Sequence, residues 1–157
     1  MAAQLWMLRH GEAVPHDSKP DAERELTPRG RTQAEAAGRA LAALNVELAA
    51  CYASPKVRAW ETAQLACAAL NVKLIREDAL ANGFSRVDAL TLLEAHDAHI
   101  LVVGHEPSFS QVVYDLTSAR VDFKKGGVAA ISATRTAGQL LALLRPRDLE
   151  AISAPRG

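Results

Sequence analysis

Short apolar runs that alternate with longer segments of helical periodicity dominate this sequence. Each run is too short for a helix and is typical of a buried strand. The runs are residues 4–8, 48–53, 72–75 and 99–103. The helical segments are residues 27–45, 54–70, 84–96 and 108–118. An alternation of strands and helices predicts an α/β fold with a mainly parallel sheet and right-handed crossovers.

Two further apolar runs, residues 128–134 and 139–144, stand near the C-terminus. Gly138 separates them, so they are predicted to pair as an antiparallel hairpin. The residues that follow, 146–157, are predicted to form an irregular tail. A chain of 157 residues suits a single domain with one core, so one domain is predicted over residues 1–157.

The charge balance limits the classes of partner. Lysine and arginine together number 18, and aspartate and glutamate also number 18. A zero net charge argues against general binding to nucleic acid or to an acidic membrane, so any recognition of anions must be local. No apolar run approaches the roughly 18 residues of a membrane span. The N-terminus also lacks the pattern of a signal peptide, so a cytoplasmic protein is predicted.

Basic side chains follow three of the predicted strands. Arg9 and His10 come directly after the first run. Arg58 lies one turn into the helix after the second run, and His105 follows the fourth run by one glycine. In an open α/β sheet, ligands bind in the crevice beyond the carboxyl ends of the strands. The sequence therefore predicts two histidines and two arginines at one edge of the sheet.

Two predicted helices begin beside these cations. Ser54 is a natural N-cap, and Pro55 and Pro107 suit the first turn of a helix. The free N–H groups and positive dipole ends of such helices favour an anion. Gly11 and Gly104 are expected to let the backbone approach that anion closely. Because the planar fork of arginine matches phosphate oxygens, the predicted ligand is a phosphoryl group.

A histidine in such a pocket can do covalent chemistry. Its ordinary pKa of ~6.5 leaves it mostly neutral and nucleophilic near neutral pH. It could attack phosphorus, form a phosphohistidine and pass the phosphoryl group to water. The arginines and the second histidine would stabilise the phosphoryl oxygens, so no metal and no cofactor are predicted. His96 and His99 lack a convincing third ligand and are predicted to flank a strand at the surface.

Four motifs, in order, resemble the signatures of the histidine phosphatase superfamily, the phosphoglycerate-mutase-like enzymes. They are RHGE at 9–12, LTPRG at 26–30, SPKVRAWETA at 54–63 and GHEP at 104–107. The four together span most of the chain, which makes the resemblance specific, whereas RHG alone would be weak. The short length and the GHEP segment are most similar to the SixA-type phosphohistidine phosphatases.

The resemblance implies a fold and a role for each matching residue. The fold would be a three-layer α/β/α sandwich around a mixed, mostly parallel sheet. His10 would be the nucleophile. Arg9, Arg58 and His105 would bind the phosphoryl group, and the backbone N–H of Glu106 would help them.

The chain departs from the larger branches of this superfamily after its third strand. Those branches insert a segment there that carries an acidic proton donor. Residues 77–90 (EDALANGFSRVDAL) are short and lack an obvious equivalent, although Glu77 and Asp78 stand at the strand end. Glu12 is expected to tune or orient its neighbours rather than to donate a proton.

A missing acid has a chemical consequence for the substrate. Protonation of an alkoxide leaving group is worth ~10²–10⁴-fold in rate, whereas the imidazole of phosphohistidine leaves far more easily. The sequence therefore favours a phosphorylated protein of the phosphohistidine-carrier type over a small phosphoester. Two alternatives stay open: a small-molecule phosphomonoesterase, and a phospho-ligand binding module without turnover. No oligomeric state is predicted.

Overall fold

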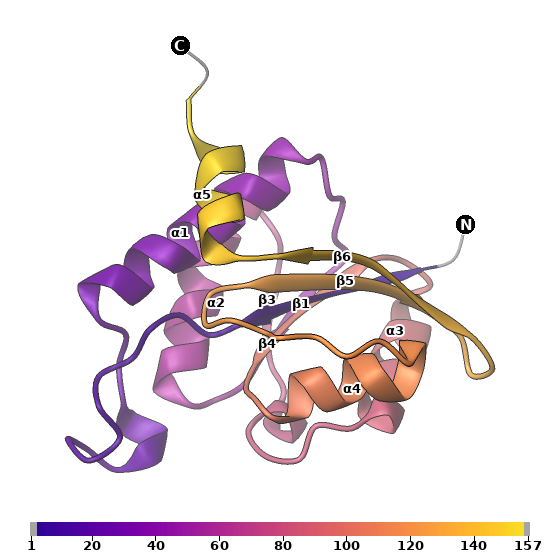
Figure 1. Cartoon of the computed structure of the whole chain (residues 1–157), viewed down its shortest axis with the longest axis horizontal. Coiled ribbons are helices and arrows are strands. Elements are labelled where there is room, and N and C mark those ends of the chain that lie inside the picture. The colour runs from indigo at the N-terminus through magenta and orange to yellow at the C-terminus, as the bar shows by residue number, and fades with distance from the viewer. Residues whose placement is uncertain (1–2, 156–157) are drawn as a thin grey trace.

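A six-stranded sheet forms the centre of the computed structural model, which describes residues 3–155 (Figure 1). The strands are β1 (Gln4–Arg9), β2 (Cys51–Ala53), β3 (Leu74–Arg76), β4 (Ile100–Gly104), β5 (Val128–Ala133) and β6 (Gly138–Leu144). The helices are α1 (Pro28–Ala43), α2 (Val57–Leu70), α3 (Arg86–His96), α4 (Ser108–Thr117) and α5 (Pro146–Ser153). Short 3₁₀ turns lie at Asp21–Glu23 and Asp78–Leu80.

The sheet is mixed and has the order β3-β2-β4-β1-β5-β6. Strands β3, β2, β4 and β1 run parallel to their neighbours, and β5 and β6 add an antiparallel hairpin on the far side of β1. This topology confirms the predicted α/β fold with a mostly parallel sheet. It also places β1 and β4, whose ends carry the predicted histidines, side by side in the middle of the sheet.

Helices cover both faces of the sheet, which makes the three layers of an α/β/α sandwich (Figure 1). Successive side chains of a strand point to opposite faces, and β1 shows this clearly. Leu5 and Met7 belong to the core shared with α3 and α4. Trp6 and Leu8 belong to the core shared with α1, α2 and α5. A strand buried on both faces is continuously apolar, as the sequence of β1 indicated.

The C-terminal segment corrects the sequence prediction. Residues 146–157 were expected to be irregular, but Pro146–Ser153 form helix α5. Pro146 occupies the first turn, and the Asp148 carboxylate accepts a hydrogen bond from the Arg145 amide at 2.9 Å, which caps the helix. Leu149 is fully buried against the core that contains α1 and α2. A helix this short depends on such packing, and the surface that supplies it lies far away in the sequence.

Candidate active site

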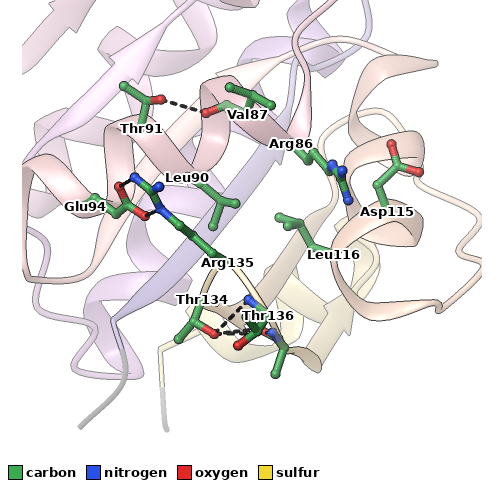
Figure 2. Close-up of a pocket in the computed structure, with 11 residues that line it drawn as sticks. Arg86, Val87, Leu90, Thr91, Glu94, Asp115, Leu116, Thr134, Arg135 and Thr136 are labelled. Carbon is green, nitrogen blue, oxygen red and sulfur yellow. Dashed lines mark hydrogen bonds and ion pairs between the residues drawn. The ribbon is translucent and has the colours of Figure 1, made fainter.

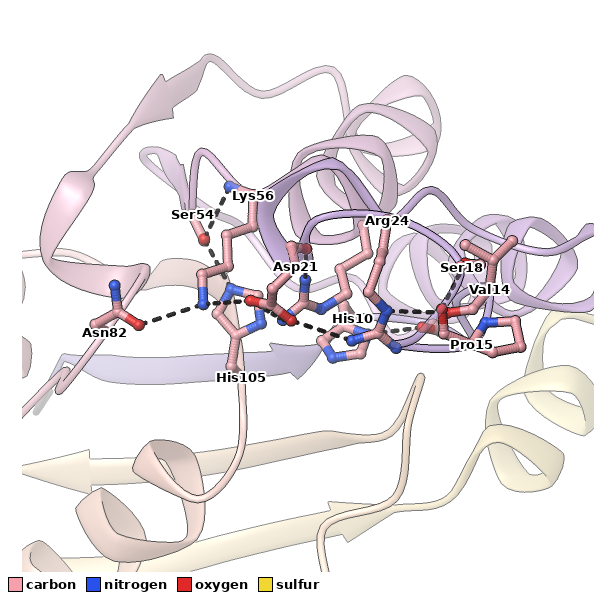
Figure 3. A network of polar contacts seen from close by, with 12 residues as sticks. His10, Val14, Pro15, Ser18, Asp21, Arg24, Ser54, Lys56, Asn82 and His105 are labelled. Atoms are coloured by element: carbon pink, nitrogen blue, oxygen red, sulfur yellow. Dashed lines mark hydrogen bonds and ion pairs between the residues drawn. The ribbon is translucent and has the colours of Figure 1, made fainter.

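The register of β1 and β4 brings the two predicted histidines together. Arg9 pairs with Gly104 across the parallel ladder, so the residues that follow them stand level at the strand ends. The rings of His10 and His105 lie with their centroids 5.3 Å apart and are tilted by 52°. Both residues are buried. The structure therefore places the two imidazoles in one site (Figure 3).

The hydrogen bond of the His10 ring determines which of its nitrogens is free. Nδ1 lies 2.7 Å from the carbonyl oxygen of Gly11. A carbonyl can only accept, so Nδ1 carries the proton and Nε2 keeps its lone pair. The pKa of His10 is lowered from 6.5 to about 3, chiefly by burial and also by the charges of Arg58 and Arg9, whereas the hydrogen bond to Gly11 raises it. His10 is thus a neutral imidazole with a nucleophilic Nε2 at physiological pH.

His105 is held by a hydroxyl. Its Nε2 lies 2.8 Å from the Oγ of Ser54, and the same oxygen accepts a hydrogen bond from the Lys56 amide at 3.2 Å. The Ser54 hydroxyl can donate its hydrogen to Nε2, which leaves the ring proton on Nδ1. Burial, followed by the charge of His10, lowers the pKa of His105 to about 3.

Ser54 does not cap a helix as predicted. Helix α2 begins at Val57, and its N-cap position is Lys56, which makes no side-chain capping bond. The Ser54 hydroxyl contacts His105 instead. The predicted cap rested on the local Ser-Pro sequence alone. The side chain that Ser54 contacts, His105, follows a different strand, β4.

The two arginines are tied to the backbone. Arg9 Nη1 donates to the carbonyl oxygen of Phe123 at 2.7 Å, and Arg58 Nη1 donates to that of Asp21 at 2.7 Å. Burial lowers the pKa of both guanidiniums, and nearby carboxylates oppose that effect. Both groups stay charged, because the ordinary pKa of arginine lies far above neutrality. The backbone contacts fix the orientation of each fork.

The site contains unpaired polar atoms. Among the described residues, the buried side-chain nitrogens and oxygens without a hydrogen-bond partner are Arg9 Nε, Arg58 Nε and His105 Nδ1. An unpaired buried donor costs about 1–3 kcal/mol. All three atoms belong to residues that the sequence assigned to phosphate binding. Acceptor oxygens, such as those of an anion, are what such nitrogens would bond.

The side chains of Glu12 and Glu106 make local hydrogen bonds. Glu12 Oε2 accepts a hydrogen bond from the Thr27 hydroxyl at 2.7 Å, and Thr27 in turn caps α1. Glu106 Oε1 accepts from the Ser110 amide at 2.7 Å, and Oε2 accepts from the Ser110 hydroxyl. The Ser110 amide was one of the α4 N–H groups expected to favour the anion, but it is occupied by Glu106.

Two glycines at the strand ends are needed for close packing. A Cβ on Gly11 would lie 2.6 Å from the carbonyl oxygen of Gly30 in α1. A Cβ on Gly104 would lie 2.9 Å from the ring of Phe109 in α4. Both distances are shorter than real Cβ contacts allow. The two glycines therefore let the helices pack closely against the strand ends.

The site includes residues that sequence reasoning missed. Thr62 Oγ1 accepts from the Gly11 amide at 3.1 Å and donates to the Arg58 carbonyl at 2.7 Å, which links the RHG loop to α2. Its place in the motif SPKVRAWETA was a signal that could have identified it. Asp21 and Lys56 form an ion pair with an N–O distance of 3.0 Å beside Arg58. Nothing in the polar loop around Asp21 distinguished it from its neighbours.

A groove of about 370 Å³ lies between α3, α4 and the turn that joins β5 to β6 (Figure 2). In its wall, Nε and Nη2 of Arg135 donate to the two carboxylate oxygens of Glu94, at 2.8 and 3.0 Å. Among the described residues that line it, none is a predicted site residue. The groove is therefore separate from the histidine site.

Two histidines outside the site have partners of their own. His96 Nε2 contacts the Tyr52 hydroxyl at 2.5 Å, and His99 Nδ1 accepts from the Gln4 amide at 2.9 Å.

Over residues 3–155, no group of three or more His, Cys, Asp or Glu side chains is placed to hold a metal ion. None of the helices in that range is long and apolar enough to cross a membrane.

Sequence comparison identifies the family. The sequence model of the histidine phosphatase superfamily (branch 1) matches residues 5–99. An uncharacterized protein of Picosynechococcus sp. is 30% identical over 162 residues, which cover 93% of this chain and 98% of that protein. The chain belongs to the histidine phosphatase superfamily. Membership of this superfamily supports phosphatase activity.

Solved structures share the fold. The protein histidine phosphatase SixA, solved with tungstate, superposes with a TM-score of 0.84 at 22% identity, over 93% of this chain and 99% of that chain. A candidate α-ribazole-5′-P phosphatase from Escherichia coli superposes with a TM-score of 0.74 at 20% identity, over 93% and 98%. The fold is thus that of SixA and of the phosphoglycerate-mutase-like proteins.

Proposed function

We propose that this protein is a metal- and cofactor-independent phosphatase that forms a phosphohistidine on His10 and acts on phosphohistidine in proteins. The observation that carries the proposal is the set of unpaired nitrogens beside His10: Arg9 Nε, Arg58 Nε and His105 Nδ1. They are donors that a phosphoryl group can satisfy while it stands within reach of a neutral imidazole. The amide of Glu106 is a further candidate donor.

The first chemical step transfers the phosphoryl group to the enzyme. The lone pair of His10 Nε2 attacks phosphorus, and the bond between phosphorus and the leaving nitrogen breaks. The electron pair of that bond goes to the leaving imidazole, which accepts a proton from solvent. Arg9, Arg58 and His105 stabilise the negative charge on the three equatorial oxygens.

The second step returns the enzyme to its starting state. Water attacks the phosphorus of phosphohistidine and gives up a proton to solvent. The P–N bond breaks, its electron pair returns to His10 Nε2, and inorganic phosphate leaves. The hydrogen bond from Nδ1 to the Gly11 carbonyl persists through both steps, so the ring keeps its orientation and its tautomer.

The state of the nearby carboxylates supports phosphohistidine as the substrate. Ion pairing with Lys56 and Arg58 holds the pKa of Asp21 well below its usual range, so this group is ionised at neutral pH. The Glu106 carboxylate is bonded to Ser110. Asp21 is therefore not suited to protonate an alkoxide, whereas a leaving imidazole needs only a proton from solvent.

A second candidate is a small-molecule phosphomonoesterase, which the fold shared with the candidate α-ribazole-5′-P phosphatase favours. A substrate panel separates the two functions. Phosphohistidine-carrier domains and small phosphoesters would be compared by kcat/KM with the purified protein. We expect the phosphoprotein to be the much better substrate. Equal turnover of alkyl phosphomonoesters would contradict this proposal and promote the second candidate.

The covalent intermediate gives a direct test of the mechanism. Radiolabelled substrate should leave an acid-labile, base-stable phosphoryl adduct on the protein, and His10→Ala should abolish it. His16→Ala is the matched control, because His16 is an exposed histidine of the same loop. Absence of both adduct and hydrolysis with every donor would instead indicate a phospho-ligand binding module.

A further inference from the structure

Asp21 places a carboxylate directly against the cations of the site (Figure 3). Its oxygens lie 3.0 Å from Lys56 Nζ, 3.3 Å from Arg58 Nη2 and 3.2 Å from Arg24 Nη1. Lys56 is held from its other side by Asn82, whose Oδ1 lies 3.2 Å from Nζ. One partly exposed carboxylate is thus in contact with three cations, Arg24, Lys56 and Arg58.

The carboxylate is not what orients Arg58. The shortest contact between the two residues runs from Arg58 Nη1 to the main-chain carbonyl oxygen of Asp21, at 2.7 Å. This bond does not depend on the side chain of Asp21. The carboxylate instead adds a negative charge 3.3 Å from Arg58 Nη2, and this charge lies at the surface, because the Asp21 side chain is 54% exposed whereas that of Arg58 is 7% exposed.

The charge of Asp21 reaches the catalytic groups. The hydrogen bond from Lys56 and the charge of Arg58 hold the pKa of Asp21 well below its usual range, so it is anionic at every physiological pH. It also acts on His105, whose pKa it raises against the stronger lowering effects of burial, His10 and Arg58. A phosphoryl dianion bound to Arg58 and His105 would therefore be repelled by Asp21.

We propose that Asp21 is a built-in anion that weakens the binding of phosphate in the site and so favours release of the inorganic phosphate product. The inference rests on the proposed function, which places a phosphoryl group on Arg58 and His105. A free phosphate ion has only its charge and hydrogen bonds with which to overcome the repulsion. A protein substrate brings further contacts outside the pocket, so it can bind despite the repulsion, whereas the phosphate product lacks those contacts and is released faster.

The test is calorimetric titration of the whole protein with inorganic phosphate, which requires no turnover. Asp21→Asn keeps the side-chain shape and the main-chain carbonyl and removes the charge. We expect it to bind phosphate roughly three- to tenfold more tightly than the wild type at low salt. The gain should shrink as ionic strength rises. Asp21→Ser removes the same charge and provides a second measurement if the asparagine variant folds poorly.

Glu23→Gln is the matched control. Glu23 is exposed and belongs to the same 3₁₀ turn, so this variant loses an equal charge away from Arg58. Its phosphate affinity should stay within about twofold of the wild type. Unchanged or weaker binding in both Asp21 variants would overturn the role of Asp21 and leave the phosphatase proposal standing. If the Asp21 variants bind phosphate more tightly but the wild type hydrolyses no phosphohistidine, the proposed function is contradicted and the role of Asp21 in phosphate binding still stands.

Discussion

The amide of His10 donates a hydrogen bond to the carbonyl oxygen of Gly104, 3.0 Å away, and thereby continues the β1–β4 ladder beyond the end of β1. The next residue after Gly104 is His105. This bond explains why two imidazoles from distant segments stand level with each other. Backbone pairing, rather than any attraction between the rings, sets their separation of 5.3 Å.

The tautomer of His105 should depend on Ser54. Removal of the hydroxyl in Ser54→Ala frees Nε2 to carry the ring proton, so Nδ1 loses its hydrogen for part of the time. We expect kcat/KM for a phosphohistidine substrate to fall by about tenfold, the size of one lost hydrogen bond in a buried site. Ser54→Thr keeps the hydroxyl and should recover most of the activity. Full activity of Ser54→Ala in steady-state assays would contradict this role.

Arg58 should not be replaceable by lysine. Lysine keeps the charge but lacks the planar fork, so it cannot bond the Asp21 carbonyl and a phosphoryl oxygen in the same geometry. We expect Arg58→Lys to lower kcat/KM by about 10²–10³-fold. Arg31→Lys is the control, because Arg31 is a half-exposed arginine of α1. If Arg58→Lys and Arg31→Lys had comparable kcat/KM values, a positive charge at position 58 would be enough for catalysis and the planar fork would not be needed.

The histidines should make stability depend on pH. The pKa of His10 is 6.5 ordinarily and about 3 in the folded protein, and that of His105 is lowered similarly. Between these values the unfolded chain binds more protons, so the free energy of unfolding falls as pH falls below 6.5 and continues to fall towards pH 3. Each histidine adds up to about 1.4 kcal/mol per pH unit in that window.

Urea denaturation at several pH values between 7.5 and 4.5 measures this dependence. Asp and Glu side chains also titrate in this pH range. The contribution of His10 is therefore measured by comparing the slope of the wild type with the slopes of the variants. His10→Gln should give a shallower slope of unfolding free energy against pH than the wild type. His16→Gln, at an exposed position, should keep the wild-type slope. Identical slopes in all three proteins would show that His10 does not titrate differently in the folded state.

Helix α5 should contribute to the stability of the fold. Leu149 is fully buried, and its truncation in Leu149→Ala should lower the free energy of unfolding by about 2–5 kcal/mol. Leu141→Ala is the control, because Leu141 is 44% exposed and should cost much less. The measurement is chemical denaturation at pH 7.5. A small, equal loss in both variants would mean that α5 is not packed as described.

Local sequence was enough to predict the strands and the edge at which the site lies. The apolar residues of β1 and β4 indicated strands buried on both faces, and Arg9, His10 and His105 follow directly in the chain. Once two such strands are parallel and in register, their ends must meet, whatever the loops between them do. Helix α5 escaped prediction because it is only eight residues long, and its core-facing residues Leu149 and Ile152 form a single i, i+3 pair, which is too short a pattern to indicate a helix.

The sequence by itself determined the class of fold and the residues at the strand ends, since these follow from local periodicity, and its residue chemistry predicted an anion site there. Only the tertiary structure decided the partners of those residues. Ser54 meets His105 across 51 positions, and Asp21 meets Arg58 across 37. No local pattern encodes such pairs, because they arise from the way the helices and loops pack around the sheet after the strands have paired.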